Sequence, residues 1–247
     1  MTDKKTTVSE HLVELRSRLI KSIIFLILAF IVCYIFSDKI YNFLVDPYAQ
    51  AVKDDGNNRR LIFTALHETF LTYLKLAFFS AFFFSCPIIL MQIWKFIAPG
   101  LYKDEKLALF PFLVATPILF LFGGMLVYYL IMPLAIKFFL SFETVSINGS
   151  LPIQLEAKVN EYLSLIMRLI LAFGISFQLP VFLTLLAKVG FITSEYLKTR
   201  RKYVVIIIFS MAAILTPPDP ITQIGLAIPL LLLYEISIYT VKLVEKK

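Results

Sequence analysis

One stretch decides the fold class of this chain: LIKSIIFLILAFIVCYIF, from Leu19 to Phe36. Its centre, Ser22 to Val32, is apolar on every face of a helix, whereas a strand of a membrane barrel alternates between apolar and polar residues. A bilayer core of about 30 Å requires roughly 20 apolar residues at about 1.5 Å each, with every backbone amide satisfied within its own segment. The stretch therefore predicts a membrane-spanning helix and excludes an outer-membrane barrel.

Five more apolar stretches follow along the 247 residues. Hydrophobic residues make up 59% of the chain, and charged residues make up 17%, against about 25% in an average soluble domain. The sequence predicts an all-α polytopic membrane protein with six transmembrane helices, forming a single membrane domain over residues 1–247. An amphipathic helix within residues 1–18 precedes the expected spans, which lie near 19–36, 70–93, 107–130, 162–186, 203–216 and 224–239.

Basic residues indicate the orientation of these spans. Most of the 24 lysine and arginine residues lie at the two ends of the chain and in the second and fourth loops, whereas the first and third loops are neutral or acidic. The positive-inside rule then places both termini of this multi-pass membrane protein in the cytoplasm. Because the net charge of +7 is dispersed over four short segments, it does not predict nucleic-acid binding.

Glu14 is a candidate binding residue on the N-terminal amphipathic helix. Val8, Leu12 and Leu15 recur at helical spacing and form the apolar face, which Leu19 continues, whereas Glu14 lies on the polar face. The simplest interpretation is an ion pair with Arg18 one turn further on, worth a few tenths of a kcal/mol. The alternative is a carboxylate that binds a ligand.

A second carboxylate, Glu105, lies in the second loop, on the same predicted side of the membrane. The Pro99-Gly100 pair predicts a turn, after which Glu105 is well placed against the N-terminal dipole of the next helix. Phe96 and neighbouring aromatic residues flank this loop. Two partly desolvated carboxylates at such a surface favour a guanidinium, which binds in a bidentate manner, over the more strongly hydrated ammonium.

At these residues the sequence resembles the TatC family, the multi-spanning component of the twin-arginine protein translocase. Four blocks carry the resemblance, in order and over essentially the whole chain. They are HLVELRSRL (residues 11–19), FIAPGLYKDE (96–105), AFGISFQLPV (172–181) and LTPPD (215–219).

The resemblance implies a concave helical bundle that acts as signal-peptide receptor and core subunit of the translocase. Such a protein exports folded cargo with a twin-arginine signal peptide and draws on the protonmotive force. Its implied partners are TatA and TatB, or a single bifunctional TatA-like protein, together with signal peptides, other copies of itself and membrane lipid. Glu14 and Glu105 match the family positions that bind the arginine pair. Phe96 matches a position near that site, although an interfacial anchor would explain it equally well.

Polar residues inside or beside the spans give further candidates. Gln178 matches a position where many family members have glutamate, so its amide argues for hydrogen bonding to a signal peptide, a partner helix or the protein's own helices rather than for proton transfer. Asp219, in a proline-rich turn, is expected to cap a helix or contact a partner. Gln223 resembles a residue of the polar cluster that contacts TatA and TatB. Pro47 matches a family proline in an amphipathic cap on the outer face.

Two other classes of function compete with this interpretation. A secondary transporter or ion channel needs a polar path, yet few ionisable groups lie at mid-membrane depth and no selectivity filter is recognisable. An intramembrane enzyme needs a nucleophile with its base or a set of metal ligands, and the two histidines, His11 and His67, are predicted on opposite faces of the membrane. The sequence therefore predicts no enzyme, no cofactor and no metal site.

Overall fold

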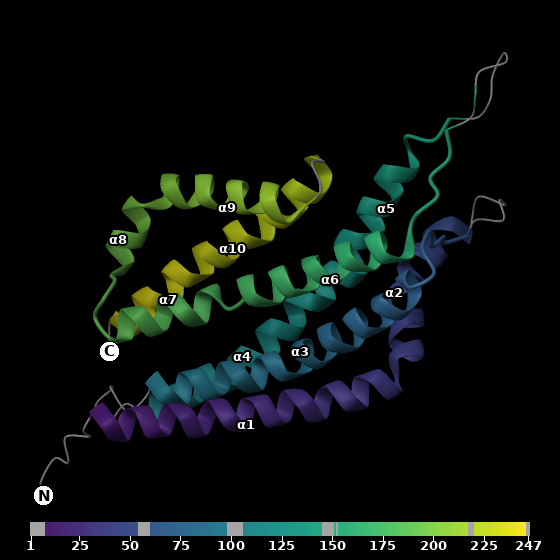
Figure 1. Ribbon diagram of the computed structural model, residues 1–247. Coiled ribbons are helices and arrows are strands. Elements are labelled where there is room, and N and C mark those ends of the chain that lie inside the picture. Colours follow the sequence, from purple (N-terminus) through teal and green to yellow (C-terminus); the bar gives the residue numbers. More distant parts are fainter. Residues whose placement is uncertain are drawn as a thin grey trace, which may run out of the picture.

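The computed structural model describes residues 8–53, 60–97, 106–144, 151, 153–216 and 220–245, and this part of the chain is built from helices (Figure 1). The elements, in chain order, are α1 (Val8–Ile35), α2 (Ser37–Lys53), α3 (Glu68–Ile97), α4 (Lys106–Leu126), the π-helical turn η3 (Val127–Ile131), α5 (Met132–Leu140), α6 (Val159–Ser176), α7 (Leu179–Lys188), α8 (Ser194–Thr199), α9 (Arg201–Leu215) and α10 (Pro220–Glu245).

Five helical segments in the described residues are long and apolar enough to cross a membrane, and they coincide with five of the six predicted spans. The predicted fifth span also forms a helix, α9. With 15 residues α9 measures about 22 Å, less than the roughly 30 Å of a hydrocarbon core, so its crossing stays a prediction. The five segments are Val13–Ile35, Glu68–Ile93, Pro111–Leu140, Val159–Lys188 and Thr222–Glu245.

The N-terminal amphipathic helix and the first span are one continuous helix, α1, of 28 residues. α1 runs alongside α3 in the opposite direction (Figure 1). At its far end the chain turns almost without a break into α2, since the amide of Ile40 still donates to the carbonyl of Phe36 at 3.1 Å. The predicted cap in the first outer loop is this helix, α2.

Prolines modify two of the spans. The third span continues beyond the predicted 107–130 through η3 into α5, and it widens to a π-helical turn just before Pro133. The fourth span is interrupted at Phe177 and Gln178, just before Pro180. Proline has no amide hydrogen, and its ring clashes with the carbonyl four residues earlier, which explains both irregularities.

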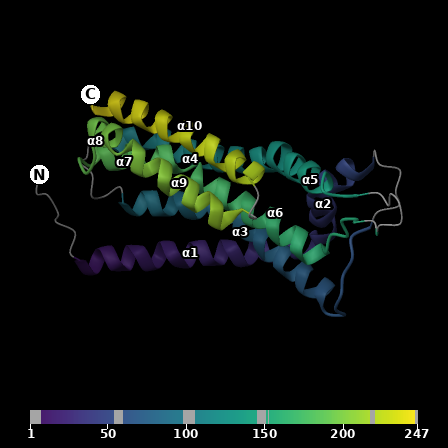
Figure 2. The same cartoon turned by 90° about the horizontal axis from the view of Figure 1, so that it is seen from above.

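Both ends of the described chain lie at the same end of the bundle (Figures 1 and 2). The start of α1, the end of α3, the start of α4, the α7–α8 connection and the end of α10 gather there, and we call it the terminal end. The opposite end, formed by α2, α5 and the start of α6, we call the cap end. Figure 2 shows that α9 and the start of α10 stop short of the cap end.

The core centres on α6, which packs against α3, α4 and η3. Leu163, Ile166 and Phe173 of α6 are fully buried there. Glycines permit the close approach of α4 and α6, because a Cβ on Gly123 would lie 2.8 Å from the carbonyl oxygen of Phe173. A Cβ on Gly174 would lie 2.8 Å from the ring of Phe120, so each helix carries a glycine where the other crosses it.

Candidate functional site

Glu14 lies at the terminal end of the bundle, in a polar cluster that joins α1 to α3. Arg18 donates to Oε1 of Glu14 through Nη2, at 2.5 Å, and through Nε, at 3.1 Å. The third nitrogen of the same guanidinium, Nη1, donates to Oε1 of Gln92 on α3 at 3.2 Å. The ion pair expected from the sequence is therefore formed, and Arg18 also ties the two helices together.

Phe96 belongs to the same surface. It lies one helical turn after Gln92 on α3, so the two side chains share a face of that helix, and the Phe96 ring is half-buried. We call Glu14, Arg18, Gln92 and Phe96 the guanidinium cluster. The second predicted carboxylate, Glu105, lies outside the described residues, immediately before α4 in the sequence.

In the guanidinium cluster, Glu14 binds a guanidinium of its own helix. The Glu14 side chain is 36% exposed and that of Arg18 is 22% exposed, so solvent screens their ion pair and its net value is a few tenths of a kcal/mol. Both hydrogen bonds go to Oε1 of Glu14, and within the described part of the chain Oε2 accepts none. A second guanidinium could therefore use Oε2, or take the place of Arg18 at little energetic cost.

Gln92 is a member of the cluster that the sequence analysis missed. Glutamine at the polar end of a span has no charge to attract notice, and its role depends on how α1 packs against α3. Its position four residues before Phe96, on the same helical face, was the available signal.

Gln178 lies at the break between α6 and α7 and is buried, with 6% of its surface exposed. Its Nε2 donates to the carbonyl oxygen of Thr116 on α4 at 2.9 Å, and its Oε1 has no hydrogen-bond partner among the residues that the structure describes. The hydrogen bond between the protein's own helices is thus present, and one acceptor remains for another group.

Gln223 joins α10 to α9, since its Nε2 donates to the carbonyl oxygen of Phe209 at 3.3 Å. The same two helices are bridged near the terminal end by an ion pair between Arg201 and Glu235, at 2.6 Å. Gln178 and Gln223 bind different helices, α4 and α9. Asp219 lies outside the described residues, so the predicted polar cluster is represented by Gln223.

Pro47 lies inside α2 at the cap end and is buried. Because proline has no amide hydrogen, the carbonyl of Phe43, four residues earlier, lacks its helical donor. The hydroxyl of Tyr128 on η3 donates to that carbonyl oxygen at 2.8 Å, and the two rings stack with centroids 4.4 Å apart. The proline thus creates the acceptor by which α2 is fastened to the bundle.

Among the residues that the structure describes, there is no group of three or more histidine, cysteine, aspartate or glutamate side chains that could hold a metal ion. Cys33 and Cys86 are both buried and unpaired with each other.

Comparison with known proteins assigns the family. The family model for the Sec-independent protein translocase protein (TatC) matches residues 10–229. The TatC protein of Magnetococcus marinus is 47% identical over 245 residues, which is 99% of this chain and 87% of that protein. The TatC protein of Rickettsia prowazekii is 46% identical over 236 residues, or 96% of this chain and 92% of that protein.

The fold agrees with this assignment. A crystal structure described as the twin-arginine translocase receptor TatC superimposes with a TM-score of 0.79 at 38% identity, covering 96% of this chain and 100% of the other. The helical bundle expected from the resemblance is therefore that of TatC. On the family model, the relatives and the fold together, this chain belongs to the TatC family of Sec-independent protein translocase proteins.

Proposed function

We propose that this protein is the receptor and core subunit of a twin-arginine translocase, which binds signal peptides with two adjacent arginines and moves folded cargo across a membrane with the protonmotive force. The observation that carries the proposal is the guanidinium cluster. There a partly exposed carboxylate, Glu14, holds a guanidinium from its own helix at the surface where a signal peptide would arrive. The fold of a twin-arginine translocase receptor supports the same conclusion over a secondary transporter or ion channel.

The terminal end of the bundle faces the cytoplasm in this proposal. It gathers the start of α1, the end of α3, the start of α4, the connection between α7 and α8 and the end of α10. In the sequence, most of the lysine and arginine residues lie in or next to these segments. The positive-inside rule favours this orientation in the inner membrane of a bacterium. The five long apolar segments, with α9 as the sixth crossing, return the chain to the membrane face where it began and support a single multi-pass domain over the whole chain.

Binding would begin with exchange of guanidinium groups. One arginine of the signal peptide replaces Arg18 on Glu14 or uses Oε2 beside it, and the second arginine binds Glu105 in the connection between α3 and α4. The amide oxygen of Gln92 accepts a hydrogen bond from the guanidinium that is not bound to Glu14, either that of Arg18 or that of the peptide. The ring of Phe96 lies beside these groups and lowers the local dielectric constant. The protein acts without a catalytic step or a cofactor.

Partner subunits would use the other polar residues. We propose that TatA and TatB, or a single TatA-like protein, contact the α9–α10 region through Gln223 and Asp219, and that the unpaired oxygen of Gln178 accepts a hydrogen bond from a partner or a signal peptide. A hydrogen bond between helices in a membrane contributes about 0.6 kcal/mol on average, which suits contacts that must form and break. Further copies of this chain complete the assembly.

The test is binding of a fluorescent twin-arginine signal peptide to the protein in nanodiscs. We expect Glu14→Ala and Glu105→Ala each to weaken binding by about tenfold or more, because a hydrogen bond to a charged group contributes about 1.5–3 kcal/mol. The matched control is Glu195→Ala, which removes an exposed carboxylate from α8 at the same end. A twin-lysine peptide should bind more weakly than the twin-arginine peptide. Equal binding by wild type and both variants would refute the receptor site.

A further inference from the structure

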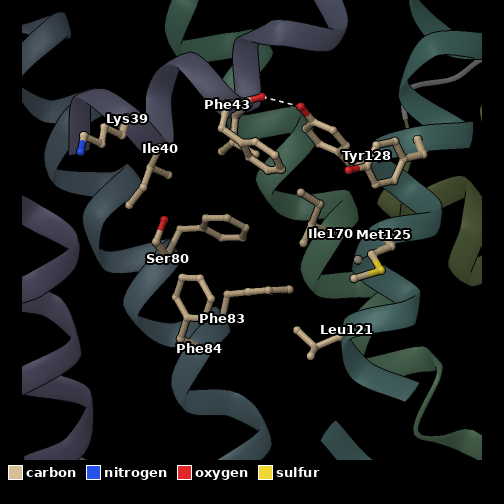
Figure 3. Close-up of a pocket in the computed structure, with 14 residues that line it drawn as sticks. Lys39, Ile40, Phe43, Ser80, Phe83, Phe84, Leu121, Met125, Tyr128 and Ile170 are labelled. Carbon is tan, nitrogen blue, oxygen red and sulfur yellow. Dashed lines mark hydrogen bonds between the residues drawn. The ribbon is translucent and has the colours of Figure 1, made fainter. Parts of the chain in front are cut away.

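A groove at the cap end of the bundle has no role in the proposed function. It has a volume of about 400 Å³ and lies between α3 and α4, with α2 above it and Ile170 of α6 at its base (Figure 3). This volume lies within the roughly 300–1,000 Å³ of sites that bind small molecules. Almost all of its lining is aliphatic or aromatic. We call it the cap groove.

The cap groove opens toward the membrane rather than into the protein. Two of the residues that line it are buried, since Leu44 is 3% exposed and Phe79 is 9% exposed. At its edges Phe84 is 58% exposed and Met125 is 55% exposed. Since this part of α3 and α4 belongs to two membrane spans, the open side faces hydrocarbon.

The depth of the cap groove matches one leaflet of the bilayer. The stacked rings of Tyr41 and Tyr73, 5.5 Å between centroids, lie where α2 meets α3 and are typical of the membrane interface. From Tyr73 to Phe84 the rise along α3 is roughly 16 Å, and half of a hydrocarbon core is about 15 Å. The groove therefore extends from the interface to about the middle of the membrane.

Two polar groups stand on one side of this apolar lining, beneath the first turn of α2 (Figure 3). The ammonium of Lys39 is exposed and lies 5.3 Å from the ring centroid of Phe36, and it has no carboxylate partner among the described residues. The hydroxyl of Ser80 belongs to a residue that is 3% exposed, and within the same part of the chain it has no hydrogen-bond partner. The ammonium of Lys39 is therefore the one of these two groups that is open to an anionic ligand.

We propose that the cap groove is a binding site for a glycerophospholipid of the leaflet at the cap end. One acyl chain fills the groove down to Phe84 and Leu121. The lipid phosphate binds the ammonium of Lys39. This site is independent of the proposed receptor function, because it lies at the other end of the bundle and involves none of the same residues.

The charge beside the groove favours a lipid over a partner helix as its occupant. A partner helix is apolar at the depth of the hydrocarbon, whereas a phospholipid brings an anionic phosphate to the ammonium of Lys39. An acyl chain is narrow and flexible enough to follow the aromatic walls. A bound lipid would also keep α2 at a fixed height, since Ile40 and Leu44 of α2 form the upper wall.

Photo-crosslinking in nanodiscs tests the proposal. The nanodiscs contain phosphatidylethanolamine and phosphatidylglycerol, with a small fraction of phospholipid that carries a diazirine near the end of one acyl chain. After irradiation and digestion, mass spectrometry locates the labelled residues. We expect label on Phe84, Leu121 and Met125 to exceed label on Ile118 and Phe122, which are at least as exposed and lie on α4 outside the groove.

Two pairs of variants assign the label to the site. Lys39→Gln should lower labelling in the groove about fivefold, the effect of one lysine on a lipid headgroup, whereas Lys137→Gln on α5 should not. Leu121→Trp should fill the groove and abolish labelling there, whereas Ile118→Trp, one turn away, should not. All four changes are at exposed or partly exposed positions, and circular dichroism verifies that each variant is folded. Labelling that is uniform along α4, or that survives both Lys39→Gln and Leu121→Trp, would overturn the proposal.

Discussion

Tyr128 holds α2 both by a hydrogen bond and by ring stacking, and their contributions to stability can be measured separately. Tyr128→Phe keeps the ring that stacks on Phe43 but removes the donor to the Phe43 carbonyl, which Pro47 has deprived of its helical amide. We expect Tyr128→Phe to lower the free energy of unfolding by about 1 kcal/mol, which lies between the average of about 0.6 kcal/mol and the maximum of about 1.7 kcal/mol for hydrogen bonds between helices in a membrane.

Pro47→Ala should rescue this loss. α2 is helical on both sides of Pro47, so the amide of an alanine there would reach the Phe43 carbonyl in the ordinary helical pattern. In the Pro47→Ala background, we expect Tyr128→Phe to cost only a few tenths of a kcal/mol. The double-mutant cycle then gives a coupling energy of about 1 kcal/mol.

Tyr162→Phe is the matched control for this cycle. Tyr162 donates to the next carbonyl of α2, that of Leu44, at 2.9 Å. The residue four positions after Leu44 is Tyr48, which has an amide of its own, so Pro47→Ala should leave the cost of Tyr162→Phe unchanged. Unfolding by increasing mole fraction of dodecyl sulfate in mixed micelles, followed by circular dichroism, provides the energies. Additive costs for Tyr128→Phe and Pro47→Ala would refute the reasoning.

Three further predictions concern other parts of the molecule. Arg18→Met removes the guanidinium that competes for Glu14 and should strengthen binding of a twin-arginine peptide about twofold, which corresponds to the energy of an exposed ion pair one helical turn apart. The control Arg16→Met should leave the affinity unchanged. Equal affinities for the two variants would contradict this prediction. Gly174→Ala should lower the free energy of unfolding by about 1–3 kcal/mol, because the new Cβ would lie 2.8 Å from the ring of Phe120. Adding Phe120→Leu to Gly174→Ala should restore part of that loss. Thermal unfolding of the single and double variants measures the two effects. The short α9 should thin the bilayer beside it. Electron cryo-microscopy of the protein in nanodiscs should show a thinner membrane beside α9 than beside α3. Equal thickness on the two sides would argue against this thinning.

The spans could be predicted from the sequence because a membrane leaves the backbone few alternatives. An apolar stretch of about 20 residues must be helical to satisfy its amides, and that argument locates α3 and α10 to within a few residues in their cores. Their ends extend further than predicted, because flanking polar residues such as Lys242 continue a helix beyond the hydrocarbon. Hydropathy carries no information about the π-helical turn before Pro133 or the break before Pro180, which depend on rearranged hydrogen bonds.

The candidate site was predictable where it depends on local spacing and not where it depends on packing. The pair of Glu14 and Arg18 follows from their separation of four residues on one helix. The contact of Arg18 with Gln92 joins residues 74 positions apart, and it forms because α1 lies against α3. Likewise, the sequence places Pro47 in a cap, but it does not predict that Tyr128 donates to the carbonyl of Phe43. That hydrogen bond depends on how α2 folds over the bundle.

The continuous helix α1 connects the terminal end of the bundle directly to the cap end. Its 28 residues form a rod of about 42 Å, with Glu14 and Arg18 near one end and the turn into α2 at the other. α1 is supported mainly along the side that faces α3, and the Arg18–Gln92 contact is its polar attachment at the terminal end. A tilt of the rod by about 5° about its terminal end would move its far end by roughly 4 Å. Because α1 is unbroken, the position of the cap therefore depends on how Glu14 and Arg18 are held at the opposite membrane surface.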